Sequence, residues 1–259
     1  MKISTSKAII ASLFFLPALF FSCKKEAASV NPNSLPVSSD EISNADAPGI
    51  YRTVSGNIKL VLQPGDYKGQ DAWIEYSPGD SSYVINNTGA IDQFKVFACT
   101  DGRIIIGRSL IKFTDLSKIP TKSYVKQATL FLYGLDEGSI HLPQGNSYYP
   151  GSPYKSFGPN DVFIRRITSD WDESSVTWYS RPSTTVSGES LISPSSKQWN
   201  DNTSSDVTQM VKTFVKYPSK NYGFMLRLEK EKIYNSYGFY SSECSTPSKR
   251  PKLVIVYSN

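Results

Sequence analysis

Short runs of alternating apolar and polar residues fill most of the chain from residue 57 onward. Successive side chains of an extended strand point to opposite faces, so this alternation predicts strands with one buried face. Gly, Pro, Asn, Asp and Ser separate the runs, and these residues favour turns. We therefore expect about ten short strands, at 57–63, 71–77, 92–99, 102–113, 125–135, 161–167, 175–180, 222–229, 237–243 and 252–258.

The segment 205–221 follows a helical period instead. Its apolar residues recur every three or four positions and would form one stripe, at Val207, Met210, Val211, Phe214 and Val215. Asp206 occupies an N-cap position, Gln209 three residues later completes a capping box, and Pro218 marks the end. The pattern as a whole predicts an all-β sandwich or barrel, with one short helix over an open end or edge.

The N-terminus has the features of a lipoprotein signal peptide, residues 1–22. Lysines precede an apolar run over 8–21, which contains Pro17 and is shorter than the roughly 20 residues needed to cross a bilayer. Ser22 directly precedes Cys23, and this arrangement resembles the relaxed lipobox of Bacteroidota lipoproteins, in which the cysteine receives the lipid. We expect Cys23 to be the lipid anchor. The alternative is a secreted protein in which Cys23 is incidental.

We expect the stretch 23–56 to be a flexible tether that begins with the lipidated cysteine, because it is rich in Ser, Ala, Asn and Pro and has no apolar periodicity. The remaining residues, 57–259, suffice for one all-β domain that buries about 70% of its unfolded surface. Such a protein would be secreted and lipid-anchored to the outer membrane or the cell surface, facing outward or toward the periplasm. The charged residues after Cys23 loosely resemble a surface-export signal.

Charge is distributed unevenly along the chain. The formal net charge is +5, and it becomes +3 when Lys2 and Lys7 are removed with the signal peptide. Residues 37–102 hold nine Asp and Glu against four Lys and Arg, whereas residues 103–259 hold thirteen against twenty. A basic C-terminal part favours an acidic polymer or an anionic envelope as partner. Nucleic acid is not expected in that compartment.

Phrases spread over most of the chain carry a family resemblance. In order they are DAWI (71–74), GRSLIKF (107–113), VKQATLFLY (125–133), ITSDWDESSVTWYSRP (167–182), DVTQMVKTFVKYPSKNYGFMLRL (206–228), SSE (241–243) and RPKLVIVY (250–257). Together they resemble the DNRLRE domain, also classed as carbohydrate-binding module family 96. The resemblance implies a β-jelly-roll sandwich that binds carbohydrate without cleaving it, in relatives an alginate-type uronic acid polymer. The chain departs from the family pattern at Thr114 and in a long loop over 136–160.

The phrase DWDESSVTW, 170–178, has two interpretations. Its acids beside tryptophans could be the general acid and base of a glycosidase with sugar-stacking rings, or they could form a structural turn and strand. The resemblance favours the structural interpretation, in which Val176 and Trp178 face the core and Trp171 packs on a neighbouring loop. Glu173 would accept backbone N–H bonds or pair with a strand arginine. The predicted structural motif is Asp170, Trp171, Glu173, Trp178 and Asp206.

Two places could bind an acidic sugar chain, which requires exposed aromatic faces and fixed donors for carboxylates. The first is the loop 144–161, with Tyr148, Tyr149, Tyr154, Lys155 and Phe157 among Gly and Pro. The second is a set of basic strand residues, Arg108, Lys112, Arg165 and Arg166. Arg108 and Lys112 have the same parity and share a face. The loop could instead cap the sandwich with its own aromatics, and Arg108 could instead pair with an acid such as Glu173.

Catalytic and metal chemistry find little support in the sequence. His141 is the only histidine and lies in a loop without a partner acid, which gives no basis for a triad or a histidine metal site. Cys99 and Cys244 could form a disulfide, but we expect two separate thiols. Acidic turns at 78–80, 99–102 and 200–206 could hold a structural calcium ion, although none has EF-hand spacing.

We therefore expect a non-catalytic module that binds an acidic polysaccharide and needs no certain cofactor. Two alternatives remain open. One is a structural or adhesive envelope protein that binds a protein partner. The other is a polysaccharide lyase that uses Tyr and Arg, since the many tyrosines of the chain offer candidate bases.

Overall fold

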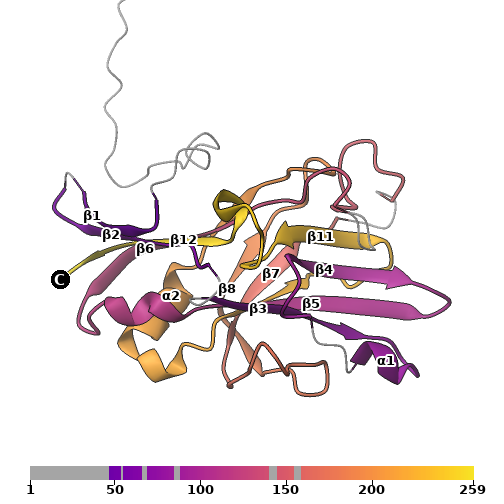
Figure 1. Ribbon diagram of the computed structural model, residues 1–259, viewed down its shortest axis with the longest axis horizontal. Helices are drawn as coiled ribbons and strands as arrows, with labels where there is room; N and C mark the ends of the chain where they lie inside the picture. Colours follow the sequence, from indigo (N-terminus) through magenta and orange to yellow (C-terminus); the bar gives the residue numbers. More distant parts are fainter. Residues whose placement is uncertain (1–46, 54, 66–68, 85–87, 140–144, 155–158) are drawn as a thin grey trace, which may run out of the picture.

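Two antiparallel β-sheets form the body of the protein in a computed structural model, which describes residues 47–53, 55–65, 69–84, 88–139, 145–154 and 159–259. The sheets lie face to face as a sandwich, and helix α2 (Thr208–Lys216) lies at one end of it (Figure 1). The predicted all-β sandwich with one short helix is confirmed. Among the described residues, no helix is both long and apolar enough to cross a membrane.

The smaller sheet has five strands in the order β1-β2-β12-β6-β9. They are β1 (Gly49–Arg52), β2 (Ile58–Leu62), β12 (Lys252–Ser258), β6 (Tyr124–Leu132) and β9 (Thr203–Asp206). Strand β1 lies within the stretch that the sequence predicts as tether, and it pairs with β2 from Gly49 opposite Val61 to Arg52 opposite Ile58. The sheet thus begins ahead of residue 57.

The larger sheet has seven strands, six of them in the order β11-β4-β5-β10-β7-β8. They are β11 (Asn235–Tyr240), β4 (Gln93–Thr100), β5 (Ile104–Phe113), β10 (Phe224–Leu228), β7 (Val162–Ile167) and β8 (Thr184–Ile192). Strand β3 (Gly69–Tyr76) covers one edge of β5, while β4 and β10 share the other edge in succession. The sheet therefore branches at β5.

The predicted apolar stripe is confirmed, since its five residues are all buried. The predicted N-cap is wrong, because Asp206 ends β9 and Val207 is the N-cap of α2. Gln209 is then the second helical residue, one position too early for a capping box. The Asp206 carboxylate nevertheless accepts the Thr208 N–H at 2.8 Å. The helix ends at Lys216, and the 3-10 turn η4 (Pro218–Lys220) starts at the expected proline. The other segments are α1 (Ser81–Val84), η2 (Thr114–Lys118) and η5 (Pro247–Lys249).

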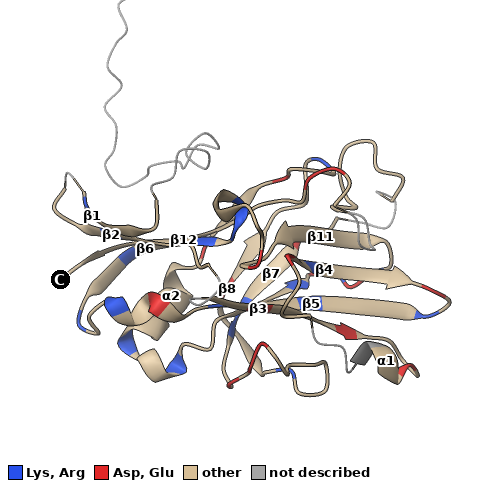
Figure 2. Ribbon diagram, viewed as in Figure 1, with Lys and Arg blue, Asp and Glu red and all other residues tan. Residues whose placement is uncertain are grey.

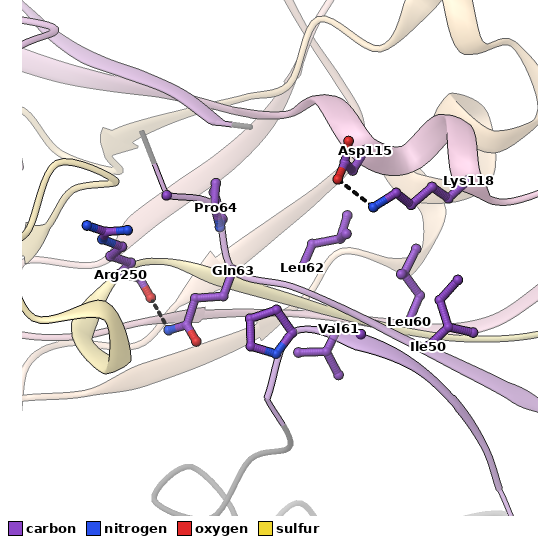
Figure 3. A pocket seen from close by; sticks show the side chains of 12 residues that line it. Ile50, Leu60, Val61, Leu62, Gln63, Pro64, Asp115, Lys118 and Arg250 are labelled. Carbon is purple, nitrogen blue, oxygen red and sulfur yellow. Dashed lines mark hydrogen bonds and ion pairs between the residues drawn. The ribbon is translucent and has the colours of Figure 1, made fainter. Parts of the chain in front are cut away.

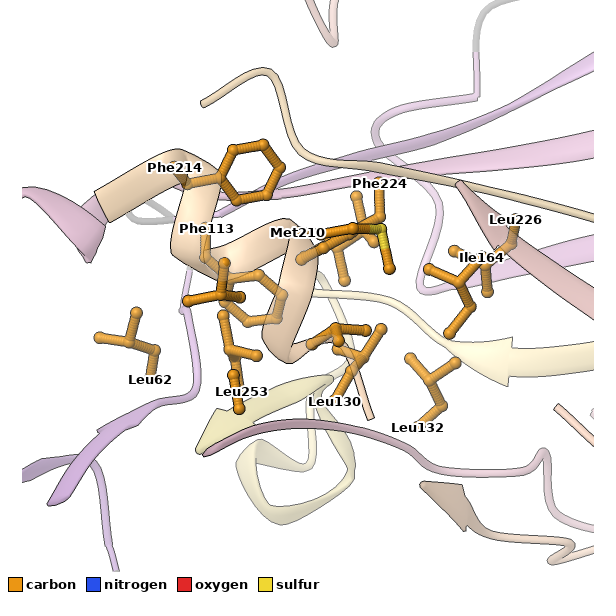
Figure 4. Packing of buried hydrophobic residues seen from close by; sticks show 14 of the residues in the cluster. Leu62, Phe113, Leu130, Leu132, Ile164, Met210, Phe214, Phe224, Leu226 and Leu253 are labelled. Carbon is orange, nitrogen blue, oxygen red and sulfur yellow. The ribbon is translucent and has the colours of Figure 1, made fainter. Parts of the chain in front are cut away.

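The main hydrophobic cluster fills the space between the sheets beneath α2. Figure 4 shows Met210 and Phe214 of α2 beside residues of both sheets. The Phe214 and Phe224 rings meet edge to face with centroids 5.4 Å apart, an arrangement that aromatic rings prefer. Because both sheets and α2 share one cluster, residues 47–259 contain the core of a single folding unit.

The strand predictions fail in two ways. The run 175–180 forms turns, because the Asp172 carbonyl accepts the Val176 N–H at 2.8 Å and the Asp172 Oδ1 accepts the Ser174 N–H at 3.0 Å. Strands β8 and β9 were not expected. They are rich in Thr and Ser, so they lack the apolar alternation on which the prediction depends.

The structure tests the prediction for two cysteines but leaves four other predicted residues untested. Cys99 and Cys244 are separate free thiols, as expected. Cys23, His141, Lys155 and Phe157 lie outside the described residues, so the structure does not test the predictions made for them.

Candidate functional site

The tyrosine loop, described over 145–154, is bonded to the start of strand β11. The Ser147 N–H donates to the Ser236 carbonyl at 3.1 Å, and the Ser236 N–H donates back to Ser147 Oγ at 2.5 Å. The Tyr148 carbonyl also accepts a side-chain hydroxyl, that of Ser195. Tyr148 and Tyr149 are half-buried in this arrangement. Part of the loop therefore does cap the sandwich with its own aromatics.

Tyr154 is the most exposed of the predicted tyrosines, with 41% of its surface accessible. Its ring stacks on Tyr234, with centroids 5.2 Å apart and planes 18° apart. Tyr234 has a φ of +68°, which is uncommon for an aromatic residue, and it ends the turn 229–234 between β10 and β11. Stacking covers one face of each ring, so the outer face of Tyr154 is the surface that a pyranose could contact.

Strand register divides the predicted basic residues between two faces of the larger sheet. Directly opposed residues of neighbouring strands lie on one face. Leu110, which lies between Arg108 and Lys112, opposes Met225, and Met225 opposes Arg165. Arg108, Lys112 and Arg165 therefore share the outer face.

Arg166 lies on the other face. It opposes Phe224, whose ring belongs to the core between the sheets. The register instead adds Arg227 to the outer face, two residues beyond Met225. The sequence prediction did not include this residue.

The outer-face arginines are held by two glutamates. Arg108 donates to Glu231 through Nε at 2.8 Å and Nη2 at 3.1 Å, and Arg227 Nη2 lies 3.2 Å from the same carboxylate. Arg165 Nε donates to Glu189 at 2.8 Å. Burial lowers the pKa of Arg227, while the negative charge of Glu231 raises it. The predicted Arg108–Glu173 pair is wrong, because Glu231 from the turn after β10 takes that place.

The phrase 170–178 packs over the same outer face. Val176, Trp171 and Trp178 are buried against residues of β3, β5 and β10, namely Ala72, Ile74, Leu110 and Met225. Trp171 Nε1 donates to the Tyr222 carbonyl at 2.8 Å. The Arg108 and Arg181 guanidinium carbons both lie 4.7 Å from the Trp178 ring centroid. Trp178 is only 8% exposed, so its ring positions arginines and is not open to a sugar.

The turn 229–234 connects the two predicted places. It supplies Glu231 to the arginines and Tyr234 to the stack with Tyr154. We call the set Arg108, Arg165, Arg227, Glu189 and Glu231 the arginine face. Sequence parity could not have found it, because the pairing of β10 with β5 and β7 decides which arginines meet.

Glu173 belongs instead to a carboxylate cluster with Asp71 and Glu243. Each offers one oxygen, and these oxygens lie within 4.8 Å of one another. Glu173 Oε1 accepts the Asp71 N–H at 2.7 Å, which confirms the expected backbone bond, and Asp71 Oδ2 accepts the Ser242 N–H at 2.8 Å. Oxygen ligands suit a hard cation such as calcium. Within the described chain, the acidic turns proposed from sequence do not take part in this cluster.

Burial governs the electrostatics of this cluster. Asp71 is 2% exposed, and burial raises its pKa well above the usual range, with the nearby charge of Glu243 acting in the same direction. Burial also raises the pKa of Glu173, although the bond from the Asp71 N–H opposes that change. The cluster therefore favours binding protons or a cation over holding three free charges.

A pocket of about 450 Å³ lies between strands β1 and β2 and the 3-10 turn η2. Figure 3 shows Leu60 and Leu62 on its wall, with Lys118 and Asp115 paired beside them. Of the predicted ligand-binding residues that the structure describes, none lines this pocket. It is thus separate from the arginine face.

The comparison with known families decides what kind of domain carries these features. The model of carbohydrate-binding module family 96 matches residues 68–257. The chain belongs to this family. No curated protein matches the chain.

The family 96 match covers strands β3 to β12 and therefore includes the arginine face, the tyrosine pair and the carboxylate cluster. Strands β1 and β2 precede the matched residues. The protein is thus a carbohydrate-binding module of β-sandwich architecture, as the resemblance of the sequence phrases implied.

Proposed function

We propose that this family 96 module binds an acidic, uronic acid-containing polysaccharide across the arginine face, with Tyr154 as a stacking platform at its margin. The observation that carries the proposal is the gathering of three arginines from three adjacent strands on one outer sheet face. Planar guanidinium groups bind carboxylates through paired N–H donors, which is the chemistry that a uronate requires.

The arginines keep donors for a ligand even though they are paired. A guanidinium has several N–H donors, and among the described residues Arg165 hydrogen-bonds only through Nε, to Glu189. Its side chain is 20% exposed, so the remaining N–H groups can face solvent or a ligand. The glutamates fix the direction of each guanidinium, which reduces the entropy lost when a sugar carboxylate binds.

We further propose that the module performs no catalysis and reaches its glycan as a lipid-anchored protein of the cell surface or outer membrane. The leader 1–22 and Cys23 support the anchor, and the described residues contain no histidine for acid–base chemistry. Lipid labelling of the protein in cells, abolished by Cys23→Ser, would test the anchor.

Affinity electrophoresis tests the ligand. Residues 47–259 should be retarded in gels containing alginate or pectin and not in gels containing neutral glycans. Arg165→Ala and Arg227→Ala should each weaken retardation by about tenfold, the scale of one charged hydrogen bond. Tyr154→Ala should weaken it several-fold.

Arg52→Ala is the matched control, because Arg52 is exposed on the smaller sheet and its loss should change nothing. Retardation by none of the polymers would overturn the proposal and leave a protein partner as the better explanation. Release of unsaturated uronate products would establish a lyase instead.

A further inference from the structure

The end of the molecule around α2 carries an unusual concentration of lysine. Lysines recur along η2 and the start of β6 and along α2 and η4, and α2 packs on both β6 and η2 (Figure 2). We call the set Lys122, Lys126, Lys212, Lys216 and Lys220 the lysine face. None of the five forms an ion pair with a described residue. The nearby acids are already engaged, Asp115 with Lys118 and Asp206 with the start of α2.

Two exposed tyrosines lie next to lysines of this face. Tyr124 is 63% exposed and Tyr217 is 45% exposed. Lys212 Nζ lies 5.5 Å from the Tyr124 ring centroid, while Lys216 Nζ and Lys220 Nζ lie 5.1 and 5.2 Å from that of Tyr217. Ammonium groups thus cover ring faces that a pyranose would need for stacking.

Strand β1, which lies toward the same end of the molecule as α2 (Figure 1), carries an exposed aliphatic side chain. Ile50 of β1 is 58% exposed and lines the pocket of Figure 3 together with Lys118 of η2. Lysines interleaved with tyrosines and an exposed aliphatic residue are typical of surfaces at the boundary between a bilayer and water. Lysine is also a compact charge suited to phosphate groups, whereas planar recognition of carboxylates favours arginine.

We propose that the lysine face rests on an anionic lipid bilayer, with its ammonium groups among lipid phosphates and with Tyr124, Tyr217 and Ile50 at the depth of the headgroups. Attraction of several lysines to lipid phosphates would hold the domain in one orientation. This contact is independent of the carbohydrate function.

The position of the face agrees with this role. Strand β1 is the first strand of the domain and contributes Ile50, so the chain enters the domain at this end. In Figure 1 α2 and β1 lie toward one end of the long axis, while the loop described over 145–154 lies toward the other. A domain resting on the lysine face would therefore present the loop described over 145–154 away from the bilayer (Figure 1).

Vesicle partitioning of residues 47–259 tests the proposal. The protein should sediment with phosphatidylcholine vesicles that contain phosphatidylglycerol, should not sediment with pure phosphatidylcholine vesicles, and should be released by salt. The affinity of the triple variant K212E/K216E/K220E for anionic vesicles should fall by at least about 100-fold. This is the binding energy of one basic residue at an anionic surface, taken for three residues.

The matched control is K197E/K230E/K232E, which makes the same change of charge at three exposed lysines outside the lysine face. It should retain most of the binding. If the first triple variant is unfolded by circular dichroism, the corresponding Lys→Gln variant replaces it.

Equal loss in both triple variants, or no preference of the wild-type domain for anionic vesicles, would overturn the proposal. Loss of retardation by alginate in K212E/K216E/K220E with unchanged vesicle binding would identify the lysine face as a glycan surface and would also overturn it. The glycan test uses different variants and a different readout, so the two proposals can fail separately.

Discussion

Arg108 and Arg227 share one carboxylate, that of Glu231, although they belong to the adjacent strands β5 and β10. Glu231 itself comes from the turn that follows β10. Its side chain is 14% exposed, and those of Arg108 and Arg227 are 18% and 23% exposed. The carboxylate thus fixes two half-buried guanidinium groups side by side on the outer face of the larger sheet.

Glu231→Gln should lower the free energy of unfolding by about 1–2 kcal/mol, because two half-buried guanidinium groups lose their counter-charge and solvent screens part of the effect. Urea denaturation measures the change. Glu229→Gln in the same turn is the control, since Glu229 is exposed and forms no ion pair with a described residue. Equal stabilities of the two variants would contradict a structural role for the shared carboxylate.

Asp71→Asn should alter how stability depends on pH. The raised pKa of Asp71, caused mainly by burial, means that the folded protein keeps a proton that the unfolded chain releases near pH 4. This group therefore stabilises the fold at low pH, and the contribution declines as pH rises from about 4 toward the raised pKa. The variant should lack the decline and be more stable than wild type at pH 7.

Unfolding free energies of wild type and Asp71→Asn, measured between pH 4 and 7, should diverge as pH rises. Asp170→Asn, at an exposed position in the neighbouring phrase, should run parallel to wild type. A constant difference between wild type and Asp71→Asn across this range would show that Asp71 is not protonated in the folded state.

Gly223→Ala should destabilise the protein by more than about 3 kcal/mol, a value typical of severe overlap combined with backbone strain. Gly223 has a φ of +84°, and a methyl group there would lie 2.2 Å from the Ile111 carbonyl oxygen. Gly151 has a φ of +88° and open space around it, so Gly151→Ala should cost only about 1 kcal/mol from strain. Thermal denaturation of both variants separates overlap from strain.

The two thiols of residues 47–259 should resist alkylation at pH 8 in the folded protein. Burial, followed by the charges of Glu75 and Asp101, raises the pKa of Cys99 to about 11, and Cys244 is 4% exposed. Because the thiolate is the reactive form, iodoacetamide should label both residues rapidly only in denaturant. The intact mass of the protein should not change when a reductant is added. If the untreated protein is lighter than the reduced protein by two hydrogens, the two cysteines form a disulfide and the prediction is wrong.

Alternation of apolar residues predicted most strands because burial of one sheet face is a local constraint on sequence. The same logic failed at Val176 and Trp178, which are buried in the cluster on the outer face of the larger sheet although neither lies in a strand. It also missed β9, whose Thr203, Ser204 and Ser205 give no apolar signal. These residues are extended because they pair with β6, and hydroxyl side chains give no apolar alternation even where they are buried.

The sequence placed Arg108, Lys112 and Arg165 among the candidate ligand-binding residues, and the register put all three on one face. It could not exclude Arg166 from the binding face or add Arg227 to it. Alternation tells only which residues of one strand share a face, and strand pairing decides which residues of different strands do. The partner of Arg108 was likewise undecided, since Glu173 and Glu231 are both distant in sequence from β5.

The sequence alone determined the all-β class, the family, and the helix with its apolar stripe and its end before Pro218, because periodicity and short motifs act over short distances along the chain. Only the tertiary structure decided that Glu231 holds two arginines, that Glu173 joins Asp71 and Glu243, and that lysines of two segments form one face. These groupings arise from strand pairing and sheet packing between distant segments, which no local pattern specifies.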